Sequence, residues 1–226
     1  MPAVPLSVLL QSDDPAWPTL RQWLADASNG AVLTTTSRER GEQAVFALQA
    51  SVQTTLGAIA RYTAGVSVDQ GWLRLLGAGD GQHPGLREWN GLGVGQVALP
   101  GALVVAHDVL GGFYAVNGGG LPGPTGETFY RSPRTLEWLS LGVGYTRFVQ
   151  WALDADLEAF YVGLRWKGWS ALTRALSPDE GFAFYPDLHV QPDTRGAHAL
   201  DRRRRDRVPM RVLWELSLDG TPVAEA

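Results

Sequence analysis

The stretch from residue 102 to residue 153 constrains the fold more than any other part of this sequence. In it, short runs of β-branched and aromatic residues alternate with turn residues, which is typical of strands joined by tight reversals. Gly111 and Gly112 supply the backbone freedom that a hairpin turn needs. Strands are predicted at 103–105, 113–116, 127–131 and 137–141. Four consecutive strands with short connections form an antiparallel meander.

A helix is expected directly after the meander. Tyr145, Phe148, Val149 and Ala152 recur at spacings of three and four residues, which gives residues 145–153 one apolar face. That face would cover the sheet. The prediction is therefore an α+β protein, with a central and mostly antiparallel sheet and helices packed on it.

The chain on either side of this stretch adds helices and short strands. Before it we expect an edge segment at 4–10, helices ending near 29, 52 and 65, the second of them capped by Ser37, a strand at 31–36, and either a strand pair or one interrupted strand at 66–76. After it we expect a long helix at 156–176, which Gly163 and Gly168 weaken near its middle, a strand at 181–185 and a final helix opened by Pro209. The 226 residues are enough for one sizeable core. We therefore predict one α+β domain over residues 1–226, with a flexible loop at 186–207.

The sequence contains no cysteine. Disulfides, thiolate metal sites and a cysteine nucleophile are therefore excluded, which fits a cytoplasmic protein. No run of residues approaches the ~20 apolar positions that a membrane span requires. We expect a cytoplasmic protein with no membrane partner.

Five segments carry a resemblance to a known family. They are LGAIARYTAGVSVDQGWLRLLGAG, DVLGGFYAVNGGG, FYRSPRTLEWLSLGVGYTRFVQWAL, FYVGLRWKGW and GFAFYP. Through them, nearly the whole chain resembles an uncharacterised bacterial family of cytoplasmic proteins that is classified only as a domain of unknown function. More distantly, the glycine-bounded strands followed by EWLSLGVGYTRFVQWAL are similar to the SUKH superfamily. That similarity implies a SUKH-like α+β fold and a protein partner, because many SUKH members are immunity proteins that bind and neutralise toxins.

The residue types that bind common cofactors do not occur at the required spacings. The glycines at 77, 79 and 81 lack both the third glycine of a dinucleotide loop and the helix that should follow it. Lys167 is the only lysine, and no phosphate-binding loop surrounds it. The four histidines show none of the spacings typical of metal ligands. We expect no metal and no cofactor.

Three residues are candidates for acid–base chemistry. His107 and Asp108 lie at a predicted strand end beside the turn at 111–112, and Asp69 lies in the break of the 66–76 segment. Hydrolytic chemistry needs titratable groups held at strand ends in a cleft. The alternative is that Asp69 and Asp108 cap turns through their own backbone, which is a common role of aspartate.

Two further groups of residues are candidates for binding. Trp166 and Trp169 are three residues apart and are either interface anchors or core residues. The one run of like charge is Arg202, Arg203, Arg204 and Arg205. It is open to three interpretations: a solvated loop, a clamp on acidic residues of the same chain, or a grip on an acidic partner or nucleic acid. The net charge of −4 argues against nucleic acid, because its binders usually show a broad basic face.

The missing catalytic motifs and the SUKH-like resemblance favour a non-enzymatic protein-binding module, of the immunity or toxin-neutralising kind. Its partner would be another protein, such as a toxin. The alternative is a hydrolase or small-molecule enzyme that uses Asp69, His107 and Asp108 in a cleft. Nucleic-acid binding through the arginine run is a third hypothesis.

Overall fold

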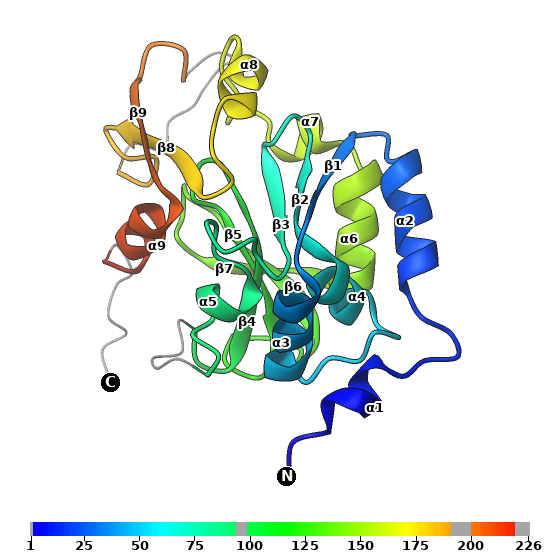
Figure 1. The fold of residues 1–226 in the computed structure, drawn as a ribbon. Helices are drawn as coiled ribbons and strands as arrows, with labels where there is room; N and C mark the ends of the chain where they lie inside the picture. Colours follow the sequence, from blue (N-terminus) through cyan, green and yellow to red (C-terminus); the bar gives the residue numbers. More distant parts are fainter. Residues whose placement is uncertain (1, 94–98, 191–199, 220–226) are drawn as a thin grey trace, which may run out of the picture.

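One seven-stranded antiparallel sheet organises the protein, and each of its strands pairs with its neighbours along the chain (Figure 1). The structure is a computed structural model that describes residues 2–93, 99–190 and 200–219. The strands are β1 (Ala31–Thr35), β2 (Thr63–Val68), β3 (Leu73–Leu76), β4 (Ala102–Asp108), β5 (Phe113–Asn117), β6 (Glu127–Arg131) and β7 (Trp138–Gly144). The predicted four-strand meander forms β4 to β7, and the antiparallel α+β fold is confirmed. The meander continues through β1, β2 and β3, so it spans the whole sheet.

Three helices cover one face of the sheet, which we call the helical face (Figure 1). They are α2 (Trp17–Asp26), α4 (Thr55–Tyr62) and α6 (Tyr145–Asp154). The predicted apolar face of α6 is confirmed, because Phe148, Val149 and Ala152 are fully buried. The ring of Phe148 lies 4.9 Å from that of Tyr114 on β5. This contact joins the helix to the middle of the sheet.

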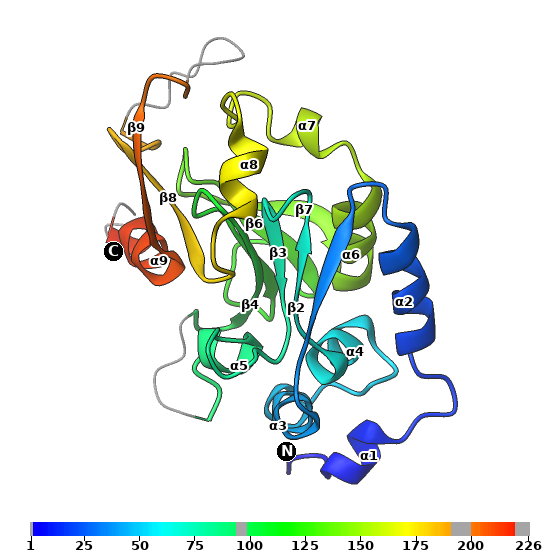
Figure 2. The same ribbon diagram turned by 45° about the horizontal axis from the view of Figure 1, so that its top comes forward.

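The opposite face carries the short helix α5 and a C-terminal part of the chain (Figure 2). It consists of α5 (Leu86–Trp89), α9 (Met210–Asp219) and a two-stranded sheet of β8 (Glu180–Tyr185) and β9 (Arg204–Pro209). Phe113 on this face lies 5.9 Å from Trp89 and 4.8 Å from Trp214. One contiguous cluster of buried apolar side chains includes residues from Leu9 to Trp214, and the single domain over 1–226 stays a prediction.

The remaining helices confirm some predicted boundaries and correct others. They are α1 (Leu6–Leu10), α3 (Arg38–Leu48), α7 (Leu157–Phe160) and α8 (Trp169–Arg174). Ser37 accepts the amide hydrogen of Arg40 and so caps α3, as expected. The edge segment expected at 4–10 is instead largely α1. The 66–76 segment is a strand pair, with the reversal at 69–71.

The predicted long helix at 156–176 is wrong. Two short helices, α7 and α8, lie there, because Gly163 and Gly168 have φ angles of 72° and 77°. That left-handed backbone conformation ends a helix. The interpretation of the arginine run as part of a loop at 186–207 is also incomplete. Arg204 and Arg205 belong to β9 and pair with Tyr185 and Phe184, whereas residues 191–199 lie outside the described residues.

Within the described part of the chain, no helix is both long and apolar enough to cross a membrane.

Candidate functional site

Asp108 lies at the end of β4 and is fully buried. Its Oδ1 accepts the amide hydrogens of Leu110 and Gly112, both at 2.9 Å, and its Oδ2 accepts the hydroxyl of Tyr130, also at 2.9 Å. Burial raises the pKa of this carboxyl, and these hydrogen bonds oppose the rise. Asp108 therefore stabilises the β4–β5 turn through the turn's own backbone, which is the alternative role considered for it.

Asp69 lies in the β2–β3 turn with a φ of 53°. Its carboxylate forms a buried ion pair with Arg165. The Arg165 guanidinium in turn lies 5.1 Å from the ring centre of Trp72 and 4.3 Å from that of Trp169. Burial raises the pKa of Asp69, and the charge and hydrogen bond of Arg165 oppose the rise. Arg165 also forms an ion pair with the exposed Glu158, so Asp69 is held by an arginine that joins two carboxylates, and Trp169 lies over this arginine.

His107 points to the other side of the sheet from Asp108, because successive side chains of a strand alternate between its two faces. It is 1% exposed, its ring lies 5.7 Å from that of Trp89, and its Nδ1 has no hydrogen-bond partner. Burial, reinforced by the nearby charge of Arg74, lowers the pKa of His107 to about 3. The imidazole is therefore neutral at pH 7.

The structure does not bring the predicted acid–base group together. Among the described residues, no ion pair and no hydrogen bond between side chains joins Asp69, His107 and Asp108 to one another. Asp108 is occupied by turn amides and a tyrosine, Asp69 by an arginine, and His107 lies on the opposite face. The hydrolase built on these three residues therefore has no structural basis in their arrangement.

The predicted binding residues separate into buried and exposed groups. Trp166 is buried against Phe182 and Phe184, with ring centres at 5.3 and 5.5 Å. It is thus a core residue rather than an exposed anchor. Arg205 lies over it, 4.9 Å from the ring centre, and Arg203 donates to the carbonyl of Pro186.

Arg202 and Arg204 are the exposed members of the arginine run. The Arg204 side chain is 75% exposed, forms an ion pair of 2.8 Å with Asp206, and lies 5.3 Å from the ring centre of Tyr185. Tyr185 is itself exposed. The β8–β9 sheet therefore presents arginine and tyrosine side chains together at the surface.

A cluster that sequence reasoning missed joins Asp80, His83 and Ser177. The His83 ring makes one hydrogen bond of 2.8 Å from Nδ1 to Asp80 Oδ2 and one of 2.9 Å between Nε2 and Ser177 Oγ. Burial alone would raise the pKa of Asp80, but hydrogen bonds from the ring and amide of His83 and the amide of Gln82 lower it to about 2. His83 and Ser177 are 94 positions apart in the sequence, so only the fold brings them together.

An acid, a histidine and a serine are connected in this cluster as they are in a hydrolytic triad. The cluster lacks the free serine hydroxyl and the oxyanion-binding amide that such a triad needs. The hydroxyl of Ser177 donates to Asp179 at 2.8 Å, and its amide donates to Glu180 at 2.9 Å. The next residue, Pro178, has no amide hydrogen, so it cannot supply the backbone donor that stabilises an oxyanion. The cluster therefore links the turn at 80–83 to the turn at 177–180 and holds no activated nucleophile.

Two adjoining cavities lie beside this cluster, on the half of the sheet formed by β1, β2 and β3. The larger, which we call the outer chamber, has a volume of about 390 Å³ and is bounded by β1, the β2–β3 turn and α8. The smaller, the inner chamber, has a volume of about 40 Å³ and is lined by His107, Trp89 and His83 among others. Arg74, Ser67 and Pro178 line both chambers. In the sequence, Arg74 interrupts the apolar run WLRLL. This charged residue within an apolar strand was the one feature of the sequence that could have indicated the two cavities.

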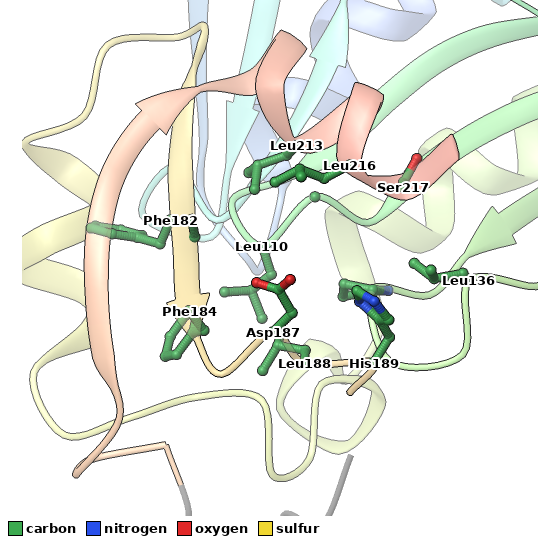
Figure 3. A pocket seen from close by; sticks show the side chains of 13 residues that line it. Leu110, Leu136, Phe182, Phe184, Asp187, Leu188, His189, Leu213, Leu216 and Ser217 are labelled. Carbon is green, nitrogen blue, oxygen red and sulfur yellow. The ribbon is translucent and has the colours of Figure 1, made fainter. Parts of the chain in front are cut away.

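A third cavity lies between β8, α9 and the β4–β5 turn (Figure 3). It holds about 50 Å³ and is mostly apolar, with Asp187 and His189 among leucine and phenylalanine side chains. In the described residues, no group of three or more histidine or acidic side chains could hold a metal ion.

Fold and site define an α+β protein built on a single antiparallel meander, with a buried arginine between two cavities. The chain belongs to the family described as Protein of unknown function DUF2625, whose model matches residues 6–213. It is 37% identical over 213 residues to the "Putative uncharacterized protein YbfG" of Escherichia coli strain K12, over 93% of this chain and 94% of that protein. It is 35% identical over 213 residues to an "Uncharacterized protein" of Haemophilus influenzae, over 93% of this chain and 92% of that protein.

No solved structure matches the chain. The predicted membership in an uncharacterised family is confirmed, whereas the similarity to the SUKH superfamily stays a prediction.

Proposed function

We propose that this protein is a non-enzymatic, cytoplasmic binding module for an acidic protein partner, of the immunity or toxin-neutralising kind. The observation that supports the proposal is the exposed arginine and tyrosine surface of the β8–β9 sheet. Residues 201–207 contain five arginines and two aspartates, a net charge of +3, in a chain whose total is −4. A basic segment on an otherwise acidic chain attracts and orients an acidic partner.

The side chains on this surface are of the types that contribute most to protein interfaces. Arginine and tyrosine are enriched among the few residues that dominate binding energy. Tyr185 and Arg204 are already ordered against each other at 5.3 Å, so less conformational entropy is lost when a partner binds them. Arg205 and Trp166 lie behind them and support the strand from the core side.

The test is native mass spectrometry of the tagged protein purified gently from its bacterial host. Three forms are compared: the unmodified chain, Arg202→Glu/Arg204→Glu, and the control Arg147→Glu, whose arginine is exposed on α6 on the helical face. We expect a stoichiometric acidic protein with the unmodified chain and the control, and its loss from the double variant. Recovery of the partner with all three forms would refute the assignment of this surface. The absence of any partner would refute the binding function.

A further inference from the structure

Arg74 on β3 is a buried cation without an ion-pair partner. It is 5% exposed. Its Nε donates to the carbonyl of Gly71 at 3.2 Å, and its Nη1 donates to the carbonyls of Ser177 and Glu180, both at 2.7 Å. Among the described residues no carboxylate lies within ion-pair distance of it, and its Nη2 has no hydrogen-bond partner.

An unpaired buried charge is costly, so it calls for an explanation in a folded protein. Main-chain carbonyls accept three of the hydrogens of this guanidinium, but no carboxylate contacts it directly. Burial lowers the pKa of Arg74 to about 10, and the more distant charges of Asp179 and Glu180 only partly oppose this, so Arg74 stays charged at pH 7. An anion that enters the cavity beside Arg74 would neutralise it.

Arg74 lines both chambers, and its hydrogen bond to Gly71 links it to the outer one. The bond from Nε to Gly71 directs the guanidinium toward the β2–β3 turn, and Gly71 lines the outer chamber but not the inner one. Arg174 also lines the outer chamber, with its Nη1 held by Gln70 at 2.7 Å. No acidic side chain is among the lining residues. The chamber thus contains two positive charges and no negative one.

The rest of the lining includes four polar side chains, those of Asn29, Ser67, Gln70 and Thr173, and is apolar on one side. The hydroxyl of Ser67 makes no hydrogen bond to any described residue, so it is available to a ligand. Val32, Leu176 and Pro178 form an apolar wall. A pocket with mostly apolar walls and a few converging polar groups is the usual form of a small-molecule site, and a volume of about 390 Å³ is at the lower end of their range.

We propose that the outer chamber binds a small organic carboxylate, with its carboxylate at Arg74 and its apolar body against Val32, Leu176 and Pro178. Arginine is the residue best matched to a carboxylate in shape and charge. Arginine also binds phosphate, but phosphate sites commonly add backbone amides that converge on the anion. Here the two lining glycine amides are already used, because Gly30 donates to the carbonyl of Ala27 at 3.0 Å and Gly71 to that of Val68 at 3.2 Å.

This site is separate from the arginine and tyrosine surface of the β8–β9 sheet and does not depend on it. Two sources supply the same chemistry: a free small acid, or the C-terminal carboxylate of a peptide. Hexanoate serves as the probe for the first source, and the dipeptide acetyl-Ala-Leu, with a free C-terminal carboxylate, for the second. Hexanamide and the dipeptide amide have the same shapes without the charge.

The test variants use an exposed position at the edge of the chamber, which leaves the fold intact. Val32 is 69% exposed, and Val32→Glu places a negative charge beside the proposed anion. Val32→Lys is the matched change with the opposite charge. Val162→Glu is the control, because Val162 is similarly exposed, at 71%, but does not line the chamber. Arg74→Gln is a further variant, read only if its thermal unfolding remains cooperative, since Arg74 also anchors the turn at 177–180.

Binding is measured by calorimetry, and its position by NMR shifts of the Ser67 and Gly71 amides. We expect at least one of the two acids to bind, its amide not to bind, and Val32→Glu to weaken binding by about tenfold or more because like charges repel at short range. Val162→Glu should bind as the unmodified chain does, and Val32→Lys should bind the acid more tightly than Val32→Glu because its charge attracts the anion. The acid that binds identifies the source. Equal binding to Val32→Glu, equal binding of acid and amide, or no binding of either acid up to millimolar concentration would overturn the proposal.

Discussion

Replacement of Asp108 tests whether this buried carboxylate has a structural role. Asp108→Ala removes the acceptor of three hydrogen bonds and leaves the amides of Leu110 and Gly112 and the hydroxyl of Tyr130 without a partner. A hydrogen bond to a charged group contributes about 1.5–3 kcal/mol, and the lower value suits bonds that share one acceptor. The three bonds together give an expected loss of about 4–5 kcal/mol in the free energy of unfolding.

Asp108→Asn separates charge from hydrogen bonding. Its single oxygen retains the two amide bonds and places an amide group beside the Tyr130 hydroxyl, so the expected loss is about 1–2 kcal/mol. The assay is equilibrium unfolding in guanidinium chloride followed by tryptophan fluorescence. Asp26→Ala, at an exposed position on α2, is the control and should change stability by no more than about 0.5 kcal/mol. A loss of under about 1 kcal/mol for Asp108→Ala would refute the structural role.

Three further outcomes follow from the described contacts. Gly57→Ala should destabilise the protein although alanine is the better helix former, because the added methyl would lie 2.0 Å from the carbonyl oxygen of Ser51; an unchanged melting temperature in calorimetry would contradict this. Asp80→Asn should remove part of the acid sensitivity of folding. The pKa of Asp80 is about 2 in the folded chain, below the value of about 3.9 in the unfolded chain. The Asp80 carboxylate therefore stabilises the fold at neutral pH, and this stabilisation is lost as the pH falls from about 4 toward 2. A variant with the same acid unfolding curve as the parent would show that this ionisation is not linked to folding. Asp69→Asn should cost about 1.5–3 kcal/mol because it removes one charged hydrogen-bond partner of the largely buried Arg165, which keeps only the exposed Glu158 as an ion-pair partner, and Arg165→Met added to it should recover part of that loss, as measured by a double-mutant cycle from urea unfolding.

The sequence was sufficient for the strands and for most helix starts because these depend on local patterns. Alternating apolar residues and glycine turns predicted β4 to β7, and Ser37 marked the start of α3 by its capping bond. The long helix at 156–176 was wrong because the apolar spacing was given more weight than two glycines that adopt a left-handed backbone. The strand character of Arg204 and Arg205 has no local signal. It comes from pairing with Tyr185 and Phe184, and tertiary context of this kind overrides strand propensity.

The candidate sites were harder to predict, because each depends on which face of the sheet a residue occupies. His107 and Asp108 are adjacent in sequence and were grouped for that reason, yet strand alternation places them on opposite faces. Conversely, Arg74 and Ser177 are far apart in sequence, and only the packing of the turn at 177–180 against β3 brings them together. The useful signal was a charged residue within an apolar strand run, since such a residue requires a partner once it is buried.

The two faces of the sheet are completed at different times during synthesis. The helical face has its covering helices once the chain has been made as far as α6, which directly follows β7. The opposite face must wait for α9, because Trp214 packs on Phe113 and Arg131 donates to the carbonyl of Ser217 at 2.6 Å. A nascent chain that has all seven strands but not yet α9 therefore leaves Phe113 covered by Trp89 but not by Trp214, and exposed apolar surface of this kind is what chaperones bind and what promotes aggregation.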